Sequence, residues 1–252
     1  MYPTRTGINV FRLSRRTLLK AGPRVRRSEA FALQHIARHT SVPVPKILKY
    51  WPLPNGGCTM ILEWFHEACT LEQRWKLIDD EARLKIAHQI RSFVEQIRCL
   101  PQPESIRGMV CAFDGSACWD ERVKRQACGP FASERHFNDF RLGLLDCYTW
   151  EPGARRDIEN IRSQLRDDHR IVLTHGDIGV RNILIDDHNN VVALIDWEMT
   201  GWMPEYWEYI KTVHGRWGKE DWLRLAREMV PPYDVEMEVD DQYIIINGGA
   251  PF

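Results

Sequence analysis

The fold is decided by the stretch LTHGDIGVRNILI, residues 173–185, and by ALIDWE, residues 193–198, which follows it. Short apolar runs typical of β-strands end here in polar residues: Asp177 in a loop, Asn182 before one run and Asp196 after the next. The Asp- and Asn-rich segment between the two runs predicts a hairpin turn. We therefore expect Asp196 to fold back beside Asn182.

These three side chains have the chemistry of a phosphoryl-transfer site. Carboxylate and amide oxygens are hard ligands suited to magnesium that carries phosphates, which makes Asn182 and Asp196 candidate ligands. Asp177, held nearby, could accept the proton of an attacking hydroxyl. A base, a metal-binding Asn and a metal-binding Asp are what phosphoryl transfer from ATP requires.

The same stretch allows a second interpretation. Asp and Asn favour turns, so each of the three could be an ordinary turn residue. Their joint spacing beside His175 and Trp197 favours a site instead. The sequence contains no G-x-x-x-x-G-K-[ST], G-x-G-x-x-G, H-E-x-x-H, G-x-S-x-G or C-x-x-C, so the corresponding nucleotide-binding, zinc and nucleophile-elbow chemistries have no support.

The chain resembles the aminoglycoside phosphotransferase/choline kinase-like family, and within it a fungal phosphotransferase-like branch. The resemblance rests on THGDIGVRNILI (174–185), on IDWEMTGWMPEYWEYIK (195–211) and on the ending GGAPF (248–252), and it extends over nearly the whole chain. It implies an α+β, protein-kinase-like two-lobed fold. A small β-rich N-lobe and a larger, mainly helical C-lobe are then expected.

The resemblance also implies roles for single residues. Asp177 would be the catalytic base and His175 a packing support for its loop, while Asn182 and Asp196 would bind Mg²⁺. ATP would be the phosphoryl donor.

Three residues of the first lobe are given nucleotide-binding roles by the same resemblance. Lys20, in TLLK, looks like the strand lysine that contacts the α- and β-phosphates. Glu29, in SEAF, looks like its helical ion-pair partner. Glu63, in MILEW, would fall at the inter-lobe hinge, where backbone groups hydrogen-bond adenine.

The expected secondary structure divides the sequence into two parts. Residues 1–65 are mostly strand-like and contain one helix, as expected of a nucleotide-binding N-lobe. Residues 66–252 are mostly helical with a small β island, as expected of a C-lobe with the catalytic loop, the metal site and the acceptor site. The expected strands and hairpin cover 9–13, 17–20, 47–53 and 58–65. The expected helices cover 29–39, 84–100, 133–147, 155–166 and 219–229. Ser28 is expected to be the N-cap of the first of these helices, and Pro204 to open one further helix. Residues 101–132 are expected to be irregular.

Composition limits the class of protein. The 252 residues carry 34 Lys+Arg against 35 Asp+Glu, a net charge of −1, which argues against a nucleic-acid partner. No apolar run approaches the ~20 residues of a membrane helix, and the N-terminal residues show no secretory signal. Seven cysteines without paired spacing are typical of reduced thiols, so we expect a cytoplasmic protein.

The segment after the metal ligand bears on the acceptor. Pro204 comes only eight positions after Asp196, too soon for the activation segment on which protein kinases hold a polypeptide. This spacing favours a small-molecule acceptor.

Aromatic residues crowd into positions 197–222 and allow two interpretations. Side chains at such spacing are more often core than ligand cage. Alternatively, Trp202 or Tyr206, with Glu198 or Glu205, contacts a cationic amine, which makes a cationic acceptor one candidate.

The functional hypothesis is an ATP- and Mg²⁺-dependent phosphotransferase, a small-molecule kinase that acts on an alcohol group. The alternatives are a catalytically silent kinase-fold binding protein and a repurposed enzyme of secondary metabolism on the same fold. The complete set of Asp177, Asn182 and Asp196 favours the kinase. Gly7 is the only glycine before Lys20, so the phosphate-covering loop is reduced, which favours the alternatives. The sequence leaves the acceptor and the oligomeric state open.

Overall fold

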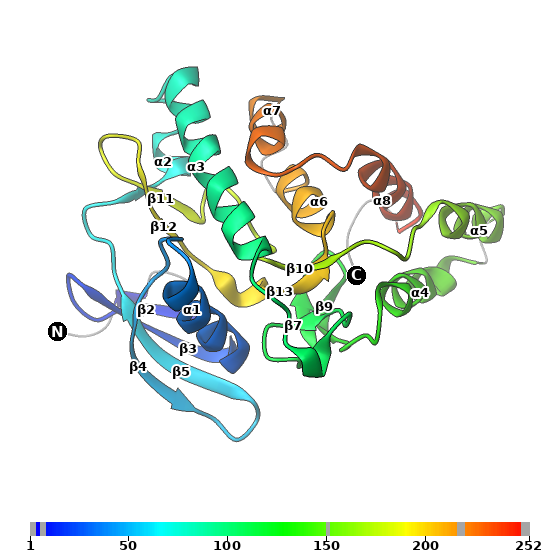
Figure 1. The fold of residues 1–252 in the computed structure, drawn as a ribbon, viewed down its shortest axis with the longest axis horizontal. Coiled ribbons are helices and arrows are strands. Elements are labelled where there is room, and N and C mark those ends of the chain that lie inside the picture. The colour runs from blue at the N-terminus through cyan, green and yellow to red at the C-terminus, as the bar shows by residue number, and fades with distance from the viewer. Residues whose placement is uncertain (1–3, 6–8, 150–151, 216–219, 248–252) are drawn as a thin grey trace.

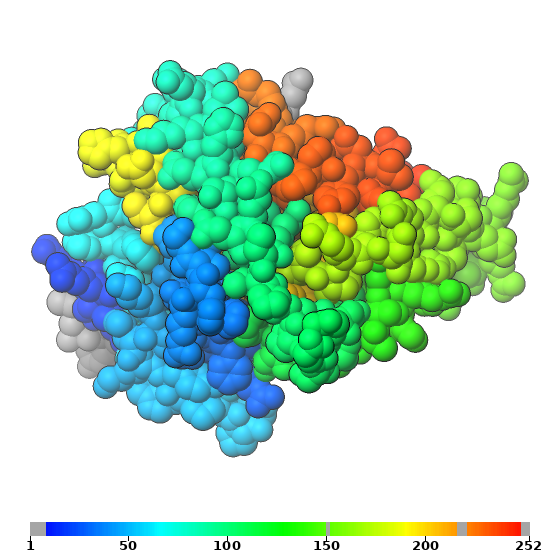
Figure 2. Space-filling view, in the orientation of Figure 1, coloured from blue at the N-terminus to red at the C-terminus, as the bar shows by residue number. Residues whose placement is uncertain are grey.

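The computed structural model describes residues 4–5, 9–149, 152–215 and 220–247 (Figure 1). Predictions that concern Gly7, positions 216–219 of the aromatic-rich segment and the ending GGAPF lie outside these residues. A β-rich part and a larger, mainly helical part lie side by side, and their outer surfaces are continuous in Figure 2. The α+β class is thus confirmed, while the boundary at residue 65 stays a prediction.

The N-terminal part is an antiparallel five-stranded sheet in the order β1-β2-β3-β5-β4. Its strands are β1 (Thr4–Arg5), β2 (Val10–Arg12), β3 (Thr17–Arg26), β4 (Ile47–Pro52) and β5 (Gly57–Glu63). Alternate residues of β5, among them Met60 and Leu62, are buried, as expected of a strand with one covered face. The predicted hairpin of 47–53 with 58–65 is the β4–β5 pair.

Helix α1 (Arg27–His39) packs its buried Leu33 and Ile36 into the same core. Ser28 was wrongly predicted as its N-cap. The helix starts directly from the extended Arg26 without a side-chain cap, and Ser28 is buried inside the first turn. Strand β3 is longer than predicted and runs straight into the helix, which moves the start toward the N-terminus.

The C-terminal part combines three small sheets with seven helices in the described residues. The first sheet joins β12, β11 and β6, the second joins β10, β13 and β7, and the third pairs β8 with β9. Their bounds are β6 (Cys69–Thr70), β7 (Cys111–Ala112), β8 (Cys118–Asp120), β9 (Lys124–Cys128), β10 (Ile171–Thr174), β11 (Ile183–Ile185), β12 (Val191–Leu194) and β13 (Gly201–Pro204).

The helices of this part carry most of its core. They are α2 (Leu71–Arg74), α3 (Asp80–Arg98), α4 (Glu134–Leu144), α5 (Ala154–Gln164), α6 (Trp207–Val213), α7 (Glu220–Met229) and α8 (Asp234–Ile246), with 3₁₀ turns η1 (Glu104–Ile106), η2 (Leu145–Tyr148) and η3 (Trp197–Met199). Helix α3 buries Ile86, Ile90, Val94 and Ile97, at the spacing of three and four residues that predicted it.

Two further predictions of secondary structure were wrong, and one helix was missed. Residues 101–132 are not irregular throughout, because they contain β7, β8 and β9. Pro204 does not open a helix: it ends β13 and pairs with Ile171, and α6 begins three residues later. Helix α8 was not predicted, because its polar and apolar residues do not separate at helical spacing.

The aromatic cluster forms core, as the more general interpretation expected. Trp197, Trp202 and Trp207 are at most 1% exposed, and Tyr206 is 3% exposed. The indole N–H of Trp202 donates to the Phe113 carbonyl oxygen at 3.2 Å. A cation cage built on Trp202 or Tyr206 is therefore wrong, since neither ring is accessible.

Glu205 also does not serve such a cage, because it accepts from the Arg170 guanidinium at 2.9 Å. All seven cysteines are free thiols. Among the helices of the described residues, none has the length and apolar character needed to cross a membrane.

Candidate active site

The predicted convergence of Asn182 and Asp196 is produced by the β11–β12 hairpin. Ile183 pairs with Leu194 in the antiparallel register, and the Ile195 N–H donates to the Asn182 carbonyl oxygen at 2.9 Å. Asn182 and Asp196 consequently stand at the same open end of the hairpin. Both line one cleft of about 730 Å³, within the size range of small-molecule sites.

Asp177 reaches the same place from the loop between β10 and β11. The Asn182 side-chain amide donates to the Asp177 carboxylate at 2.7 Å and to the Asp177 backbone carbonyl at 2.9 Å. Burial raises the pKa of Asp177 to about 6, against the favourable charge of Lys211. A carboxylate with such a pKa is suited to accept a proton near neutral pH.

His175 joins the two halves of the site. It is fully buried, accepts the Asp177 N–H on Nδ1 at 3.1 Å, and lies 3.1 Å from the Ile195 carbonyl through Nε2. Nε2 therefore carries the hydrogen of the neutral ring. Burial lowers the pKa of His175 to about 4, which keeps the ring neutral. The histidine links the loop before Asp177 to the strand end before Asp196.

Lys20 approaches the cleft from strand β3. Its ammonium lies 2.7 Å from Glu29 Oε1 and 2.8 Å from Asp196 Oδ1. Although burial disfavours the charged lysine, Glu29 and then Asp196 raise its pKa. Lys20 is thus a permanently charged, immobilised cation at the junction of the two parts. The predicted partnership with Glu29 is present.

Asp196 is held in an unusual backbone conformation. Its φ of 65° and ψ of 64° are left-handed, a region that costs a residue with a side chain about 1–3 kcal/mol. Burial would raise the pKa of its carboxyl, but Lys20 lowers it. The side chain is 41% exposed, so an anionic oxygen remains accessible from the cleft.

The structure does not bring Glu63 to this cluster. Glu63 ends β5, is half-buried, and donates its N–H to the Lys46 carbonyl at 2.9 Å. It is not among the residues that line the cleft. Its place at an inter-lobe hinge and the role of this position toward adenine both stay predictions.

Two acidic residues of the site were not predicted in their actual roles. The Glu198 carboxylate lies 3.7 Å from the Lys20 ammonium, and burial followed by the charge of Asp196 raises its pKa to about 7. Glu208, on α6, is fully buried and accepts the backbone N–H groups of His175 at 2.6 Å and Gly176 at 3.0 Å. Glu208 therefore fixes the loop that carries Asp177.

The sequence held only a faint signal for Glu208. It stands between Trp207 and Tyr209, so a carboxylate in a buried aromatic helix could have been suspected of a polar task. Burial raises its pKa to about 7. Its partners are more than thirty residues away along the chain, which no local pattern reveals.

The donor set fits magnesium held together with a nucleotide. The Asn182 amide nitrogen makes both bonds to Asp177, which leaves its oxygen for a ligand, and Lys20 contacts only one carboxylate oxygen of Asp196. Among the described residues no three His, Cys, Asp or Glu side chains are grouped to hold a metal alone. Mg²⁺ typically uses one or two protein ligands beside phosphates and water, and Asn182 with Asp196 meets that pattern.

Comparison with solved structures places the fold. A thermostable mutant of aminoglycoside phosphotransferase APH(4)-Ia in its apo form is 16% identical, with a TM-score of 0.58 over 94% of this chain and 80% of that chain. The GDP complex of aminoglycoside 2'-phosphotransferase-IIIa is 11% identical, with a TM-score of 0.63 over 97% and 82%. A ternary complex of an APH(4)-Ia variant with ADP and hygromycin B is 15% identical, with a TM-score of 0.60 over 98% and 84%. The protein-kinase-like two-lobed fold is thereby confirmed.

Comparison at the level of sequence identifies the family. No curated protein matches the chain at a significant level. The model of the phosphotransferase enzyme family matches residues 9–233, which include Lys20, Asp177, Asn182 and Asp196. The chain belongs to the phosphotransferase enzyme family.

Proposed function

We propose that this protein transfers the γ-phosphoryl group of ATP, with Mg²⁺, to a hydroxyl of a small molecule. The observation that carries the proposal is that Asp177, Asn182 and Asp196 line one cleft, while the buried Lys20, from a separate segment of the chain, contacts Asp196 from behind that lining. A purely structural set of turn residues would not require a buried lysine on a strained carboxylate.

Each residue has a task in this reaction. Asp177 positions the acceptor hydroxyl and takes its proton as the oxygen attacks the γ-phosphorus. The bond from phosphorus to the bridging oxygen breaks, and its electron pair leaves with ADP. Lys20 binds the phosphates of the nucleotide and is held in place by Glu29. Asn182 and Asp196 hold Mg²⁺, which when bound neutralises charge on the phosphates.

Two observations support a nucleoside polyphosphate as the donor, of which ATP is the one proposed. Lys20 and the two magnesium ligands select a polyphosphate, and the related structures contain GDP, ADP or AMP-PNP. The base is not specified by these contacts, so GTP is the direct competitor in any binding experiment. The seven free thiols suit a reducing compartment, and a cytoplasmic location stays a prediction.

The acceptor side of the cleft offers few free carboxylates. Glu121 lies 3.4 Å from Arg24, and Asp120 lies 2.7 Å from Lys211. Asp241, which lines the cleft, lies 3.0 Å from His214 Nε2, but with its side chain 47% exposed it is the most accessible of these three carboxylates. A cationic acceptor therefore stays a prediction, now centred on Asp241 and not on the aromatic cluster.

A binding and turnover experiment tests the proposal. Melting temperature is measured with ATP and Mg²⁺, with ATP and excess chelator, and with GTP and Mg²⁺, followed by ADP release over a panel of neutral, cationic and anionic alcohols. The expected result is Mg²⁺-dependent stabilisation by ATP and phosphorylation that is absent in Asp177→Asn. Asp187→Asn is the matched control, because Asp187 lies on the neighbouring turn with its side chain 88% exposed.

Two outcomes would contradict the proposal. Folded protein that binds no nucleotide with Mg²⁺ present would return the chain to the alternative of a silent binding protein. Nucleotide binding with full turnover in Asp177→Asn would move the chemistry to another residue.

A further inference from the structure

Lys211 and Asp120 form a second buried ion pair at the cleft. None of the steps of the proposed reaction assigns it a role. The Lys211 ammonium lies 2.7 Å from Asp120 Oδ1, and the two side chains are only 8% and 4% exposed. Asp120 is itself fixed, since it accepts the Trp207 indole N–H at 2.8 Å and the Arg122 backbone N–H at 2.8 Å. Side chains from α6 and from the β8–β9 hairpin thus hold one ammonium in place.

The Lys211 ammonium packs, through Met199, on the loop that carries Asp177. Lys211 Nζ lies 3.3 Å from Met199 Sδ. The Met199 backbone packs so closely on Gly176 that a Cβ there would lie 2.8 Å from the Met199 carbonyl oxygen. Gly176 immediately precedes Asp177, and Lys211, Met199 and Asp177 all line the cleft. The charge of Lys211 accordingly acts on Asp177.

The pair Lys211–Asp120 has the same construction as the pair Lys20–Glu29. In both, a buried carboxylate holds a buried lysine at 2.7 Å. Lys20 lies 2.8 Å from Asp196, and Lys211 lines the same cleft as Asp177. One pair belongs to the sheet and α1, and the other to the helical part. The two parts of the chain would therefore each supply one fixed cation near the reacting groups.

The other cations that line the cleft are less suited to this place. Arg24 pairs with Glu121, and Arg122 is held by Asp240. Arg125 and Arg181 are exposed, without a partner in the described part of the chain. Burying two charges is costly unless the geometry is well fixed, and an ion pair that spans two elements and opens on the cleft has a use beyond packing.

We propose that Lys211 is a second phosphate-binding cation of the site, which stabilises the negative charge on the phosphoryl group as it passes from the nucleotide to the acceptor. This inference rests on the proposed phosphotransfer. Lys211 keeps its proton throughout, and it forms and breaks no covalent bond. Charge on the transferred group is spread over its oxygens in the transition state, and a fixed cation stabilises that state more than a mobile one.

The test needs no knowledge of the acceptor. Calorimetry measures the affinity of the full chain for Mg²⁺·ADP alone and with aluminium fluoride, which imitates the phosphoryl group in transfer. Transition-state analogues bind about 10²–10⁸-fold more tightly than ground-state ligands, so fluoride should tighten binding by about 10²-fold or more. In Lys211→Met this gain should fall by about 10²–10³-fold, the usual loss for one stabilising group, while the affinity for Mg²⁺·ADP stays within about twofold.

Three further variants separate phosphate binding from a structural role. Lys211→Arg should keep part of the tightening of Mg²⁺·ADP binding by aluminium fluoride. If Lys211→Met fails to fold, Asp120→Asn replaces it in the test: this variant frees the ammonium, and its tightening should lie between that of the wild type and none. Lys124→Met is the matched control, because Lys124 pairs with Asp120 across the hairpin but does not line the cleft. It should keep the whole gain.

The outcomes divide cleanly. A full fluoride gain in Lys211→Met, or an equal loss in Lys124→Met, would overturn the role of Lys211. A wild-type chain that binds Mg²⁺·ADP but shows no fluoride gain would overturn it as well. Absence of Mg²⁺·ADP binding in the folded wild type would instead contradict the proposed function itself.

Discussion

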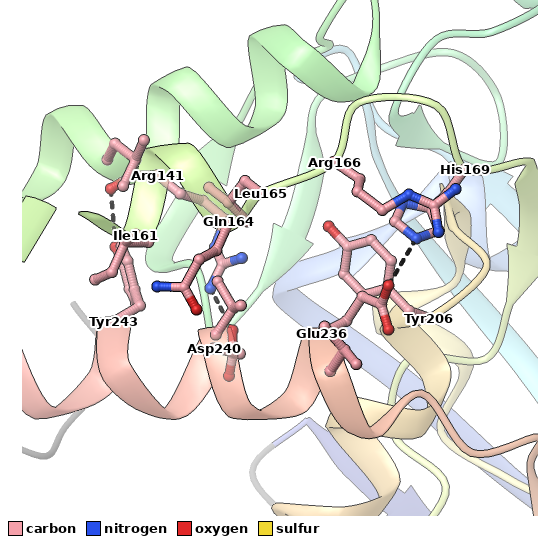
Figure 3. Close-up of a pocket in the computed structure, with 13 residues that line it drawn as sticks. Arg141, Ile161, Gln164, Leu165, Arg166, His169, Tyr206, Glu236, Asp240 and Tyr243 are labelled. Atoms are coloured by element: carbon pink, nitrogen blue, oxygen red, sulfur yellow. Dashed lines mark hydrogen bonds and ion pairs between the residues drawn. The ribbon is translucent and has the colours of Figure 1, made fainter. Parts of the chain in front are cut away.

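The cleft and the outer helical region both bury charged side chains, but they differ in how those charges are satisfied. In the outer region Asp240, on α8, is 1% exposed and is bound by Arg141 (Figure 3) and by Arg122. His169 contacts Glu134 at 2.8 Å and Glu236 at 3.1 Å.

The cavity beside these residues measures only about 20 Å³, room for about one water molecule. In the cleft, by contrast, Asp196 is strained and 41% exposed next to an opening of about 730 Å³. Buried ion pairs alone therefore do not mark a site. A site is marked by a charged side chain that is only partly paired and borders an open cleft.

The largest expected effect is a loss of activity on substitution in the cleft, which a substitution in the outer helical region should not cause. Asp177→Asn should lower turnover by about 10²–10⁴-fold, the usual contribution of a general base, because the amide cannot take the acceptor proton. Unfolding and nucleotide affinity should be close to wild type. The measurement is phosphorylation of the best acceptor of the panel, and a variant with unchanged kcat would remove Asp177 from the mechanism.

A substitution in the outer region should affect stability instead. Arg141→Met leaves the buried Asp240 with one guanidinium fewer, and breaking a buried pair costs about 3–5 kcal/mol of unfolding free energy. Urea unfolding measures this loss, and calorimetry should find unchanged Mg²⁺·AMP-PNP affinity.

Arg135→Met, on the same helix with its side chain 69% exposed, is the control and should cost about 0–1 kcal/mol. If Arg141→Met weakened nucleotide binding as strongly as a cleft variant does, the contrast between the two regions would fail.

The two regions should also respond to pH with opposite sign. His175 has its pKa lowered by burial from 6.5 to about 4, so its contribution is present above pH 6.5 and is lost as the pH falls toward 4. At about 1.4 kcal/mol per pKa unit this amounts to roughly 3 kcal/mol. Urea unfolding of wild type and His175→Gln between pH 7.5 and about 4 should show a difference that shrinks on acidification.

His169 should behave in the reverse way. Burial opposes its charged form, but Glu134 and Glu236 raise its pKa above 6.5. Its contribution is complete below pH 6.5 and is lost as the pH rises through the raised pKa. The stability difference between wild type and His169→Gln should therefore shrink on going alkaline, and a difference that grows would contradict the assignment of charge to this ring.

Much of the fold and part of the site could be predicted from the sequence alone. What could be predicted rests on interactions between residues close together in the chain. Thr70 and Gln73 form a capping box through both bonds, as a Thr followed three residues later by a Gln indicates, and the β11–β12 hairpin places Asn182 beside Asp196 as its turn residues indicated. Such contacts are local, so their residue types and spacing reveal them.

What sequence could not reach depends on packing between distant segments. Glu208 meets the loop of His175 only because α6 packs beneath it, and the partnership of Lys211 with Asp120 spans 91 residues. Strands β8 and β9 hold cysteines and charges without clear alternation, so the hairpin that carries Asp120 gave no periodic signal. Long-range charge pairs of this kind are visible only in the folded chain.

The most direct test of the account is calorimetry of AMP-PNP with and without Mg²⁺, for the wild type and Asp196→Asn. If the cleft binds nucleotide through Lys20 and a metal on Asn182 and Asp196, Mg²⁺ should tighten wild-type binding. Asp196→Asn should abolish that gain and leave the metal-free affinity nearly unchanged. Equal affinity with Mg²⁺ and with excess chelator in the wild type, or a full Mg²⁺ gain in Asp196→Asn, would contradict the account.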